Sequence, residues 1–146
     1  MTEEADILAD RVARTMLSRE GTGPAWGISI DEARLGYARI RMTLRADMAN
    51  GHGIAHGGMI FALADTAFAY ACNSCDVTTV AQQASIHFLS PAKVGETLIA
   101  EAREQAVSGR SGTYMVSVTT EDGRAVAEFQ GLSRSIGGSV LEPKGD

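Results

Sequence analysis

One segment constrains the fold of this chain more than any other: residues 57–74, with the sequence GGMIFALADTAFAYACNS. Asp65 is the single charged residue in this otherwise uncharged run. A helix so apolar on all its faces must be covered by other parts of the protein. A buried carboxylate without a partner is costly, or it stays protonated. The segment therefore predicts a long buried helix and raises the question of what Asp65 does.

The run is long enough to cross a membrane, and this alternative has to be weighed. Asp65 lies near its midpoint, five alanines and Asn73 lower its hydrophobicity, and strand-like patterns follow it. Charged residues are rare inside membrane spans. We therefore expect a core helix and no membrane partner.

An amphipathic helix is predicted before this run, at about residues 3–19. Leu8, Val12 and Met16 recur there at a spacing of four, with charged residues between them. The helix-breaking sequence Gly-Thr-Gly-Pro at residues 21–24 should end it.

The remaining patterns indicate strands. From Trp26 onward apolar residues alternate, which predicts two half-buried strands joined near residues 32–36. Asp122-Gly123 is a strong hairpin signal between the last two strands of the chain. Four strands are predicted after the apolar helix, at residues 80–89, 97–107, 113–120 and 125–135.

This order of elements predicts an α+β fold. A strongly curved antiparallel sheet is the only element available to wrap the apolar helix. A chain of 146 residues has the size of one domain, and no linker, repeat or low-complexity stretch divides it. We therefore predict a single domain over residues 1–146, with the sheet wrapped around a long central helix.

Charge and the N-terminal sequence exclude several partners and locations. The net charge is −5 and no basic cluster is present, which argues against nucleic acid and anionic membrane surfaces. The acidic start MTEEADILAD lacks the layout of a signal peptide. A cytoplasmic location is therefore expected.

The sequence predicts no metal site. Cys72 and Cys75 form a C-x-x-C, but no second pair of ligands accompanies it. The pair also lies at the negative end of the predicted helix, where a reactive thiolate is disfavoured. His52 and His56 are four residues apart, but the glycines around them place them in a loop. We expect no zinc, and two unreactive, largely buried thiols.

Two features of the apolar helix could carry chemistry together. Gly57 and Gly58 begin the helix, so their N–H groups point outward at its positive end and could polarise a carbonyl group. Asp65 adds a carboxylate, which completes a minimal set for acyl-transfer hydrolysis. The plainer alternatives are a glycine turn and an Asp that faces solvent or bonds the Thr66 hydroxyl.

The spacing of the pair has a consequence for assembly. Gly57 and Asp65 are separated by about 12 Å along one helix and roughly 80° around it, so one carbonyl group cannot contact both. Two such helices packed antiparallel across a two-fold axis would bring them together. A catalytic pair therefore predicts a dimer or a multiple of one. Small residues would permit this packing, at Ala62, Ala64, Ala67, Ala69 and Ala71.

The segment N-G-H-G-I-A-H-G-G-M-I-F-A-L-A-D-T-A-F-A-Y-A-C-N-S, residues 50–74, closely resembles the central helix region of the phenylacetic-acid-degradation acyl-CoA thioesterases, a hotdog-fold family. The resemblance continues through I-H-F-L-S-P-A-K-V-G-E-T-L, G-R-S-G-T-Y and S-R-S-I-G-G and covers about residues 25–140. It implies a hotdog fold and hydrolysis of (hydroxy)phenylacetyl-CoA or related aryl or medium-chain thioesters. It also implies a homodimer or dimer of dimers, without cofactor or metal.

The resemblance also implies roles for single residues. Asp65 would attack the thioester carbonyl or activate water, and Gly57 would supply the N–H that polarises it, with Gly58 contributing to substrate binding. His56 and Asn50 match loop positions that orient substrate or water. Their alternatives are a helix N-cap contact for His56 and turn chemistry for Asn50.

Two positions depart from the family pattern. Ser90 stands where many members carry Arg or Lys, and His87 stands where an acid or hydroxyl residue is usual. A basic residue at position 90 would pair with a coenzyme A phosphate. Its absence leaves Lys93, Arg110 and Arg134 as candidates for that contact, although each could equally be a plain surface charge.

Two other functions are compatible with a hotdog fold. A hydratase or dehydratase would need a D-x-N-x-x-H pattern, which the sequence lacks. A non-catalytic acyl-thioester-binding module would be better served by an apolar residue at position 65. Phe61, Phe68 and Tyr70 are either the lining for an aryl group or part of the core.

Overall fold

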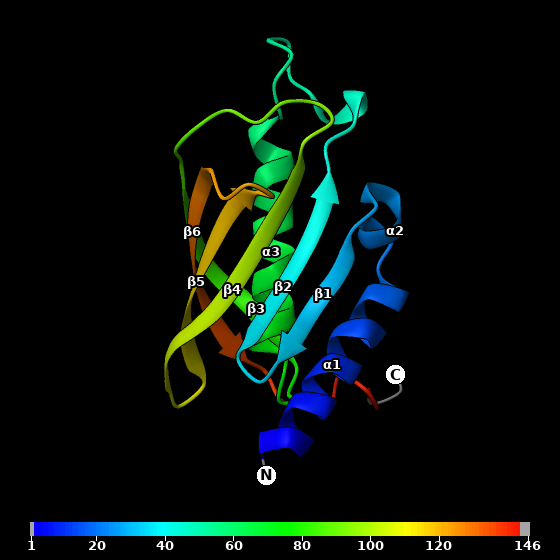
Figure 1. Cartoon of the computed structure of the whole chain (residues 1–146). Coiled ribbons are helices and arrows are strands. Elements are labelled where there is room, and N and C mark those ends of the chain that lie inside the picture. The colour runs from blue at the N-terminus through cyan, green and yellow to red at the C-terminus, as the bar shows by residue number, and fades with distance from the viewer. Residues whose placement is uncertain (1, 144–146) are drawn as a thin grey trace.

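The computed structural model describes residues 2–143 as a six-stranded antiparallel sheet with a long helix against one face (Figure 1). The strand order is β1-β2-β4-β5-β6-β3. The predicted sheet around a central helix is therefore confirmed. The elements are α1 (Thr2–Arg19), α2 (Thr22–Trp26), β1 (Ser29–Arg34), β2 (Tyr37–Thr43), the 3-10 helix η1 (Ala46–Met48), α3 (Gly57–Cys72), β3 (Thr79–Phe88), β4 (Thr97–Ser108), β5 (Ser111–Thr120) and β6 (Ala125–Ser135).

The apolar helix α3 contacts every strand and forms the centre of the core. Phe68 is fully buried, with its ring centroid 5.8 Å from that of Phe129 and 5.4 Å from that of Tyr114. Burying a side chain of this size contributes about 2–3 kcal/mol. Gly131 leaves room for the Phe68 ring, because an added Cβ would lie 2.7 Å from it. Phe68 and the equally buried Tyr70 are thus core residues and not an acyl lining.

The prediction that α3 is buried on all faces is only partly right. The sheet covers one side, and a stripe of half-buried and exposed positions remains on the other. Three of the alanines expected to face a second helix are in fact buried in the core, namely Ala64, Ala67 and Ala71. Only Ala62 and Ala69 lie on the open side.

The chain differs most from the prediction between α1 and β1. α1 ends as predicted, but the stretch expected to be a breaker and the start of a strand forms the short helix α2. Pro24 fits there because it lies in the first turn, where its missing N–H costs nothing. Gly27 ends α2 with a φ of 67°, and its N–H bonds the Gly23 and Pro24 carbonyls. Trp26 is therefore helical, and β1 begins only at Ser29.

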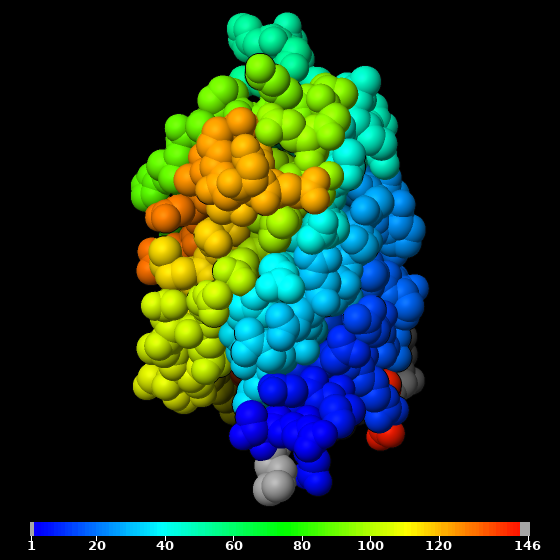
Figure 2. All heavy atoms as spheres, in the orientation of Figure 1, coloured from blue at the N-terminus to red at the C-terminus, as the bar shows by residue number. Residues whose placement is uncertain are grey.

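The first helix closes one edge of the sheet. α1 packs along β1 and touches α3. Figure 2 shows the α1 side chains as a surface continuous with those of β1 and β2. The opposite edge is β3, which has a neighbour on one side only.

Candidate active site

The loop before α3 is held by hydrogen bonds within the chain. Asn50 Oδ1 accepts the backbone N–H of His52 at 2.8 Å, and the Asn50 N–H donates to the Ile54 carbonyl at 2.7 Å. Ile54 also forms a bridge with Lys93 in the loop after β3. The turn chemistry considered as the alternative for Asn50 is therefore present. Its side-chain amide nitrogen donates to no other described residue, so it stays available to a ligand.

His56 caps the start of α3. Its Nδ1 accepts the Gly58 N–H at 2.8 Å, so the neutral ring carries its proton on Nε2. Glycine at 58 protects this cap, because an added Cβ would lie 2.9 Å from Nδ1. The N-cap contact considered for His56 is thus present. The contact leaves Nε2–H of the exposed ring free to donate elsewhere.

The Gly57 N–H is left without an acceptor. The His56 cap is used by Gly58, and no hydrogen bond within residues 2–143 uses the Gly57 N–H. It lies at the positive end of a sixteen-residue helix. Phe88 packs directly on this glycine, since an added Cβ at 57 would lie 3.1 Å from Phe88 Cζ. The first residue of α3 is therefore a free donor beside an aromatic ring, and such a donor can polarise a carbonyl.

Asp65 lies in the middle of α3 and is half-buried. No hydrogen bond or ion pair between described residues includes its carboxylate, and the Thr66 hydroxyl donates to the Ala62 carbonyl at 2.7 Å instead. The alternative in which Thr66 satisfies Asp65 is therefore wrong. Burial raises the pKa of Asp65 above its ordinary value. A carboxylate with a raised pKa and no partner is suited to act as a base or nucleophile.

The surroundings of Asp65 are open on one side. Gly58, Ala62, Asp65 and Ala69 share a helical stripe that the sheet does not cover. The neighbouring edge strand β3 is exposed over most of its length. Small residues and a bare strand edge leave the carboxylate accessible to another molecule.

An apolar pocket of about 410 Å³ lies beside Gly57. Sequence patterns did not predict this pocket, although the apolar pair Phe88-Leu89 stands at the end of β3. Phe88 and Leu89 are each 54% exposed. Ser90 is part of the pocket wall, but its hydroxyl donates to the Ala125 carbonyl at 2.6 Å. The lining consists of Ile54, Ala55, Gly57, Ile60, Phe88, Leu89, Ser90 and Pro91.

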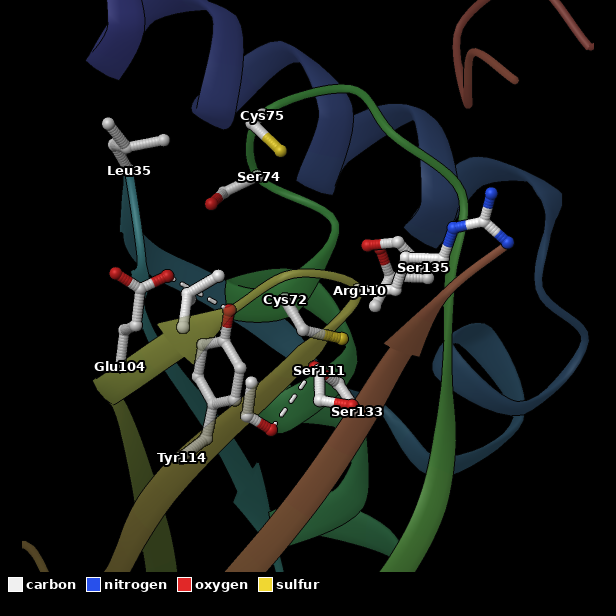
Figure 3. Close-up of a pocket in the computed structure, with 13 residues that line it drawn as sticks. Leu35, Cys72, Ser74, Cys75, Glu104, Arg110, Ser111, Tyr114, Ser133 and Ser135 are labelled. Carbon is white, nitrogen blue, oxygen red and sulfur yellow. Dashed lines mark hydrogen bonds between the residues drawn. The ribbon is translucent and has the colours of Figure 1, made fainter. Parts of the chain in front are cut away.

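A second cavity, of about 300 Å³, lies at the opposite end of α3 (Figure 3). Cys72 contributes to its wall, seven residues after Asp65 and so about 10 Å further along nearly the same helix face. The Tyr114 hydroxyl donates to Glu104 Oε1 at 3.0 Å on the opposite wall. Arg110 lies at the rim. Its lining includes more hydroxyl-bearing and charged side chains than that of the first pocket.

The two cysteines differ from each other. Cys72 is buried, and burial raises the pKa of its thiol to about 12, so it is unreactive as predicted. Cys75 is exposed, which contradicts the prediction that both thiols are largely buried. The reason is that α3 ends at Cys72, and Cys75 follows in the turn before β3. Within residues 2–143 no group of three or more His, Cys, Asp or Glu side chains could hold a metal ion.

The three candidate cations for coenzyme A do not meet within one chain. Arg110 and Arg134 lie together, because Ser111 pairs with Arg134 across β5 and β6. Both are exposed, and neither takes part in an ion pair between described residues. Lys93 lies at the other end, beside the loop that precedes Gly57. His87 faces Glu128 across β3 and β6.

No helix among the described residues is long and apolar enough to span a membrane. A family model described as Thioesterase superfamily matches residues 52–127. Acyl-coenzyme A thioesterase PaaI of Escherichia coli is 41% identical over 128 residues, which cover 88% of this chain and 91% of that protein. The solved structure of the E. coli PaaI protein from the phenylacetic acid degradation operon has a TM-score of 0.90 at 40% identity, with coverage of 92% and 97%.

Two further solved structures extend the comparison. A mutant of the phenylacetic acid degradation protein PaaI from Thermus thermophilus is 35% identical, with a TM-score of 0.77 and coverage of 80% of this chain and 100% of that one. The protein smu.793 from Streptococcus mutans, bound to acetyl CoA, is 25% identical, with a TM-score of 0.74 and coverage of 77% and 90%. The matched family segment includes both the free Gly57 N–H and Asp65.

Proposed function

This chain belongs to the thioesterase superfamily and is an acyl-CoA thioesterase with the hotdog fold, and we propose that it acts on aryl and medium-chain thioesters at a site shared by two subunits. The aryl substrates would be phenylacetyl-CoA and hydroxyphenylacetyl-CoA. The observation that carries the proposal is the unpartnered Asp65 carboxylate on the same helix as an unused Gly57 N–H.

In the proposed reaction the thioester oxygen accepts the Gly57 N–H, which stabilises the negative charge that develops on it. Asp65 either attacks the carbonyl carbon or takes a proton from the water that does. The carbon–sulfur bond then breaks, and coenzyme A leaves as a thiolate. If Asp65 is the base, it returns the proton taken from water to the thiolate and the free acid is released. If Asp65 is the nucleophile, water hydrolyses the acyl–aspartyl anhydride to the free acid and the Asp65 carboxylate, and supplies the proton for the thiolate. The His56 Nε2–H and the Asn50 amide are free to orient the substrate or the water.

Two subunits are needed because the two groups lie too far apart on one helix. An antiparallel pair of α3 helices would place Gly57 of one subunit beside Asp65 of the other. The open stripe of small residues on α3 and the bare edge of β3 support this arrangement. A dimer of dimers would preserve the same site.

The same arrangement suits coenzyme A. The cavity beyond Cys72 is lined by Arg110 and by Ser111, which pairs with Arg134, and its hydroxyl and carboxylate groups could bond the amides of the pantetheine arm. The two arginines would then bind its phosphates. In an antiparallel dimer, Lys93 of one subunit would lie at the same end as Arg110 and Arg134 of the other. The acetyl-CoA complex of the S. mutans relative supports a coenzyme A ligand for this fold.

Complementation between two inactive variants tests the shared site. Asp65→Asn should lower kcat by at least about 10²-fold, because the amide can neither attack nor accept a proton. Gly57→Pro removes the N–H donor, which makes no hydrogen bond within the described chain, and His56 already has the extended backbone that precedes proline. Each variant alone should be nearly inactive.

In an exchanged mixture about half the dimers are mixed, and each mixed dimer has one intact site of two. About a quarter of wild-type activity should return. Gly57→Ala is the matched control for steric effects, since it adds the same Cβ beside Phe88 but keeps the N–H, and it should retain clearly more activity than Gly57→Pro. Asp47→Asn controls for the loss of an acid outside the site. A mixture that exchanges subunits but stays inactive would disprove the shared site.

A further inference from the structure

The direction of the Gly57 N–H depends on contacts outside its own helix. The two residues before it each donate a backbone N–H to a distant carbonyl. Ala55 donates to the Ala92 carbonyl at 2.8 Å, and His56 donates to the Met48 carbonyl at 2.8 Å. Ala92 is buried and lies in the loop after β3. The backbone that leads into the N–H donor is therefore braced by this loop.

One acid closes the turn that follows Ala92. The Glu96 N–H donates to the Lys93 carbonyl at 3.1 Å, and Glu96 Oε1 accepts the Lys93 N–H at 2.8 Å. Lys93 in turn forms a bridge with Ile54, the residue before Ala55. The backbone and the side chain of Glu96 thus both fix the segment that lies against the start of the candidate site.

Arg124 ties the same loop to the β5–β6 hairpin. Its Nη2 donates to both carboxylate oxygens of Glu96, at 3.0 and 3.2 Å, and to the Pro91 carbonyl at 3.0 Å. Pro91 and Glu96 stand on either side of Ala92, so one guanidinium group holds the loop at two points. The hydrogen bonds from the Lys93 N–H and from Arg124 also lower the pKa of Glu96, which keeps its carboxylate ionised at neutral pH.

This ion pair is partly exposed, and such a pair contributes little to stability. Its contacts reach the backbone that directs the Gly57 N–H. We propose that Glu96 and Arg124 are positioning residues for the reaction, which hold Ala92 where it aligns that N–H with the thioester oxygen. This inference rests on the proposed function, because it concerns the same donor. Both residues act through the loop and not through contact with the substrate.

The test measures kcat and KM for the release of coenzyme A from phenylacetyl-CoA and hexanoyl-CoA. Glu96→Ala should lower kcat by about tenfold and leave KM within about twofold of wild type, because a displaced donor loses contact with the charge that develops in the transition state. Glu96→Gln keeps an oxygen for the Lys93 N–H and should retain most of the activity. Arg124→Ala leaves the hydrogen bonds within the turn intact and should lower kcat by less than Glu96→Ala does.

Glu121→Ala is the matched control. Glu121 also stands at the β5–β6 hairpin and pairs with an arginine, but that arginine is Arg41 on β2, at 3.4 Å. The variant should therefore keep the wild-type kcat and KM. Hydrogen exchange of the Ala55 amide gives a direct readout of the brace, and it should be faster in Glu96→Ala than in Glu121→Ala.

A double-mutant cycle separates positioning of Gly57 from a general loss of structure. In the Gly57→Pro background the donor is absent, so Glu96→Ala should cause no further loss of kcat. In the Asp65→Asn background the donor is present, and the loss of about tenfold should recur.

Four outcomes would overturn the inference and leave the proposed function intact. These are an unchanged kcat in both Glu96→Ala and Arg124→Ala, a change confined to KM, an equal further loss in the Gly57→Pro background, and unchanged exchange of the Ala55 amide. A wild type that releases coenzyme A from neither substrate would instead overturn the proposed function, and this inference with it.

Discussion

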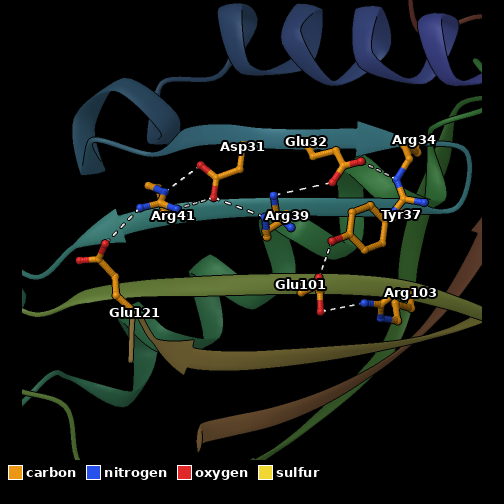
Figure 4. A network of polar contacts seen from close by, with 9 residues as sticks. All are labelled: Asp31, Glu32, Arg34, Tyr37, Arg39, Arg41, Glu101, Arg103 and Glu121. Carbon is orange, nitrogen blue, oxygen red and sulfur yellow. Dashed lines mark hydrogen bonds and ion pairs between the residues drawn. The ribbon is translucent and has the colours of Figure 1, made fainter. Parts of the chain in front are cut away.

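The two edges of the sheet are built differently. β1 is covered by α1, and its outward side chains form ion pairs with β2 (Figure 4). Asp31 binds Arg41 through both carboxylate oxygens at 2.7 Å, and Glu32 lies 3.7 Å from Arg39. β3 carries no Asp, Glu, Lys or Arg, and it pairs with β6 alone.

This contrast favours β3 as the sheet edge that meets the second subunit of the proposed dimer. Proteins protect exposed strand edges by covering them or by adding charges, because bare edges pair with other chains. The β1 edge has both kinds of protection, whereas the β3 edge has neither and is exposed at Val80 as well as Phe88. α3, the helix that carries Asp65, contacts β3, and in the proposed dimer a partner that joins the β3 edge would also cover the open side of α3.

The largest expected effect comes from charging the β3 edge. The double change Gln83→Lys and Ser85→Lys should weaken the dimer by about 100-fold or more, because each subunit would bring like charges to the shared edge. Activity should fall in parallel, since the proposed site needs two chains. Sedimentation velocity and specific activity measured across protein concentrations would show both effects.

The matched control charges the protected edge. Ser29→Lys on β1 adds a lysine at an exposed position, and it should change neither the assembly nor the activity. A β3 variant that remains dimeric and active would show that the open edge is not the interface.

A smaller effect is expected from Arg110, which lines the cavity beyond Cys72, and from Arg134, which pairs with Ser111 of the same cavity wall. Replacing Arg110 and Arg134 by Ala should raise KM by about tenfold for every acyl-CoA alike, because charge-assisted hydrogen bonds to phosphate contribute about 1–3 kcal/mol. Their effect should shrink at high salt. Arg103→Ala, which removes an arginine paired with Glu101, is the control and should leave KM unchanged. A change in kcat without a change in KM would contradict the assignment.

Asp65 on α3 and Asp31 on β1 should affect stability with opposite signs. Burial raises the pKa of Asp65, so its ionised form destabilises the fold, and this penalty appears as the pH rises from about 4 through its folded pKa. Asp65→Asn should therefore raise Tm at about pH 7, by an amount that vanishes near pH 3. Because of the same raised pKa, the activity should be lost on the acid side of the pH–rate profile at a higher pH than for an ordinary Asp.

Asp31 should behave in the opposite way. The hydrogen bonds from Arg41 lower its pKa, so its stabilisation is present above about pH 4 and is lost as the pH falls toward the folded pKa. Asp31→Asn should lower stability at about pH 7 by about 1 kcal/mol, and less near pH 3. Urea unfolding of both variants at the two pH values measures the difference, and shifts of the same sign would show that the two environments have been misassigned.

The smallest effect is expected from the cysteines. Replacing Cys72 and Cys75 by Ala should leave kcat unchanged, because neither thiol has a chemical role in the proposed reaction. Cys72→Ala should cost about 1 kcal/mol of packing energy, while the exposed Cys75→Ala should cost almost nothing. Loss of catalysis in a fully folded double variant would require a role for the C-x-x-C.

Local sequence patterns were sufficient to predict most elements of the fold. The apolar run predicted α3, and period-two alternation predicted β3 to β6 to within about two residues, because these patterns depend only on neighbours along the chain. The sequence also showed that Asp65 needs an explanation, because it is the one charged residue in an apolar helix. Helix geometry alone predicted that Gly57 and Asp65 cannot act together within one chain.

Tertiary structure decided everything that depends on distant segments. It placed Phe88 against Gly57, buried three of the five alanines, separated Lys93 from Arg110 and Arg134, and covered one sheet edge while leaving the other bare. None of these contacts has a periodic signature, since each joins residues far apart in the chain. The sequence by itself therefore determined that an acid stands in an apolar helix. Only the packing of the chain decided which strand edge stays open and which apolar pocket forms beside the start of that helix.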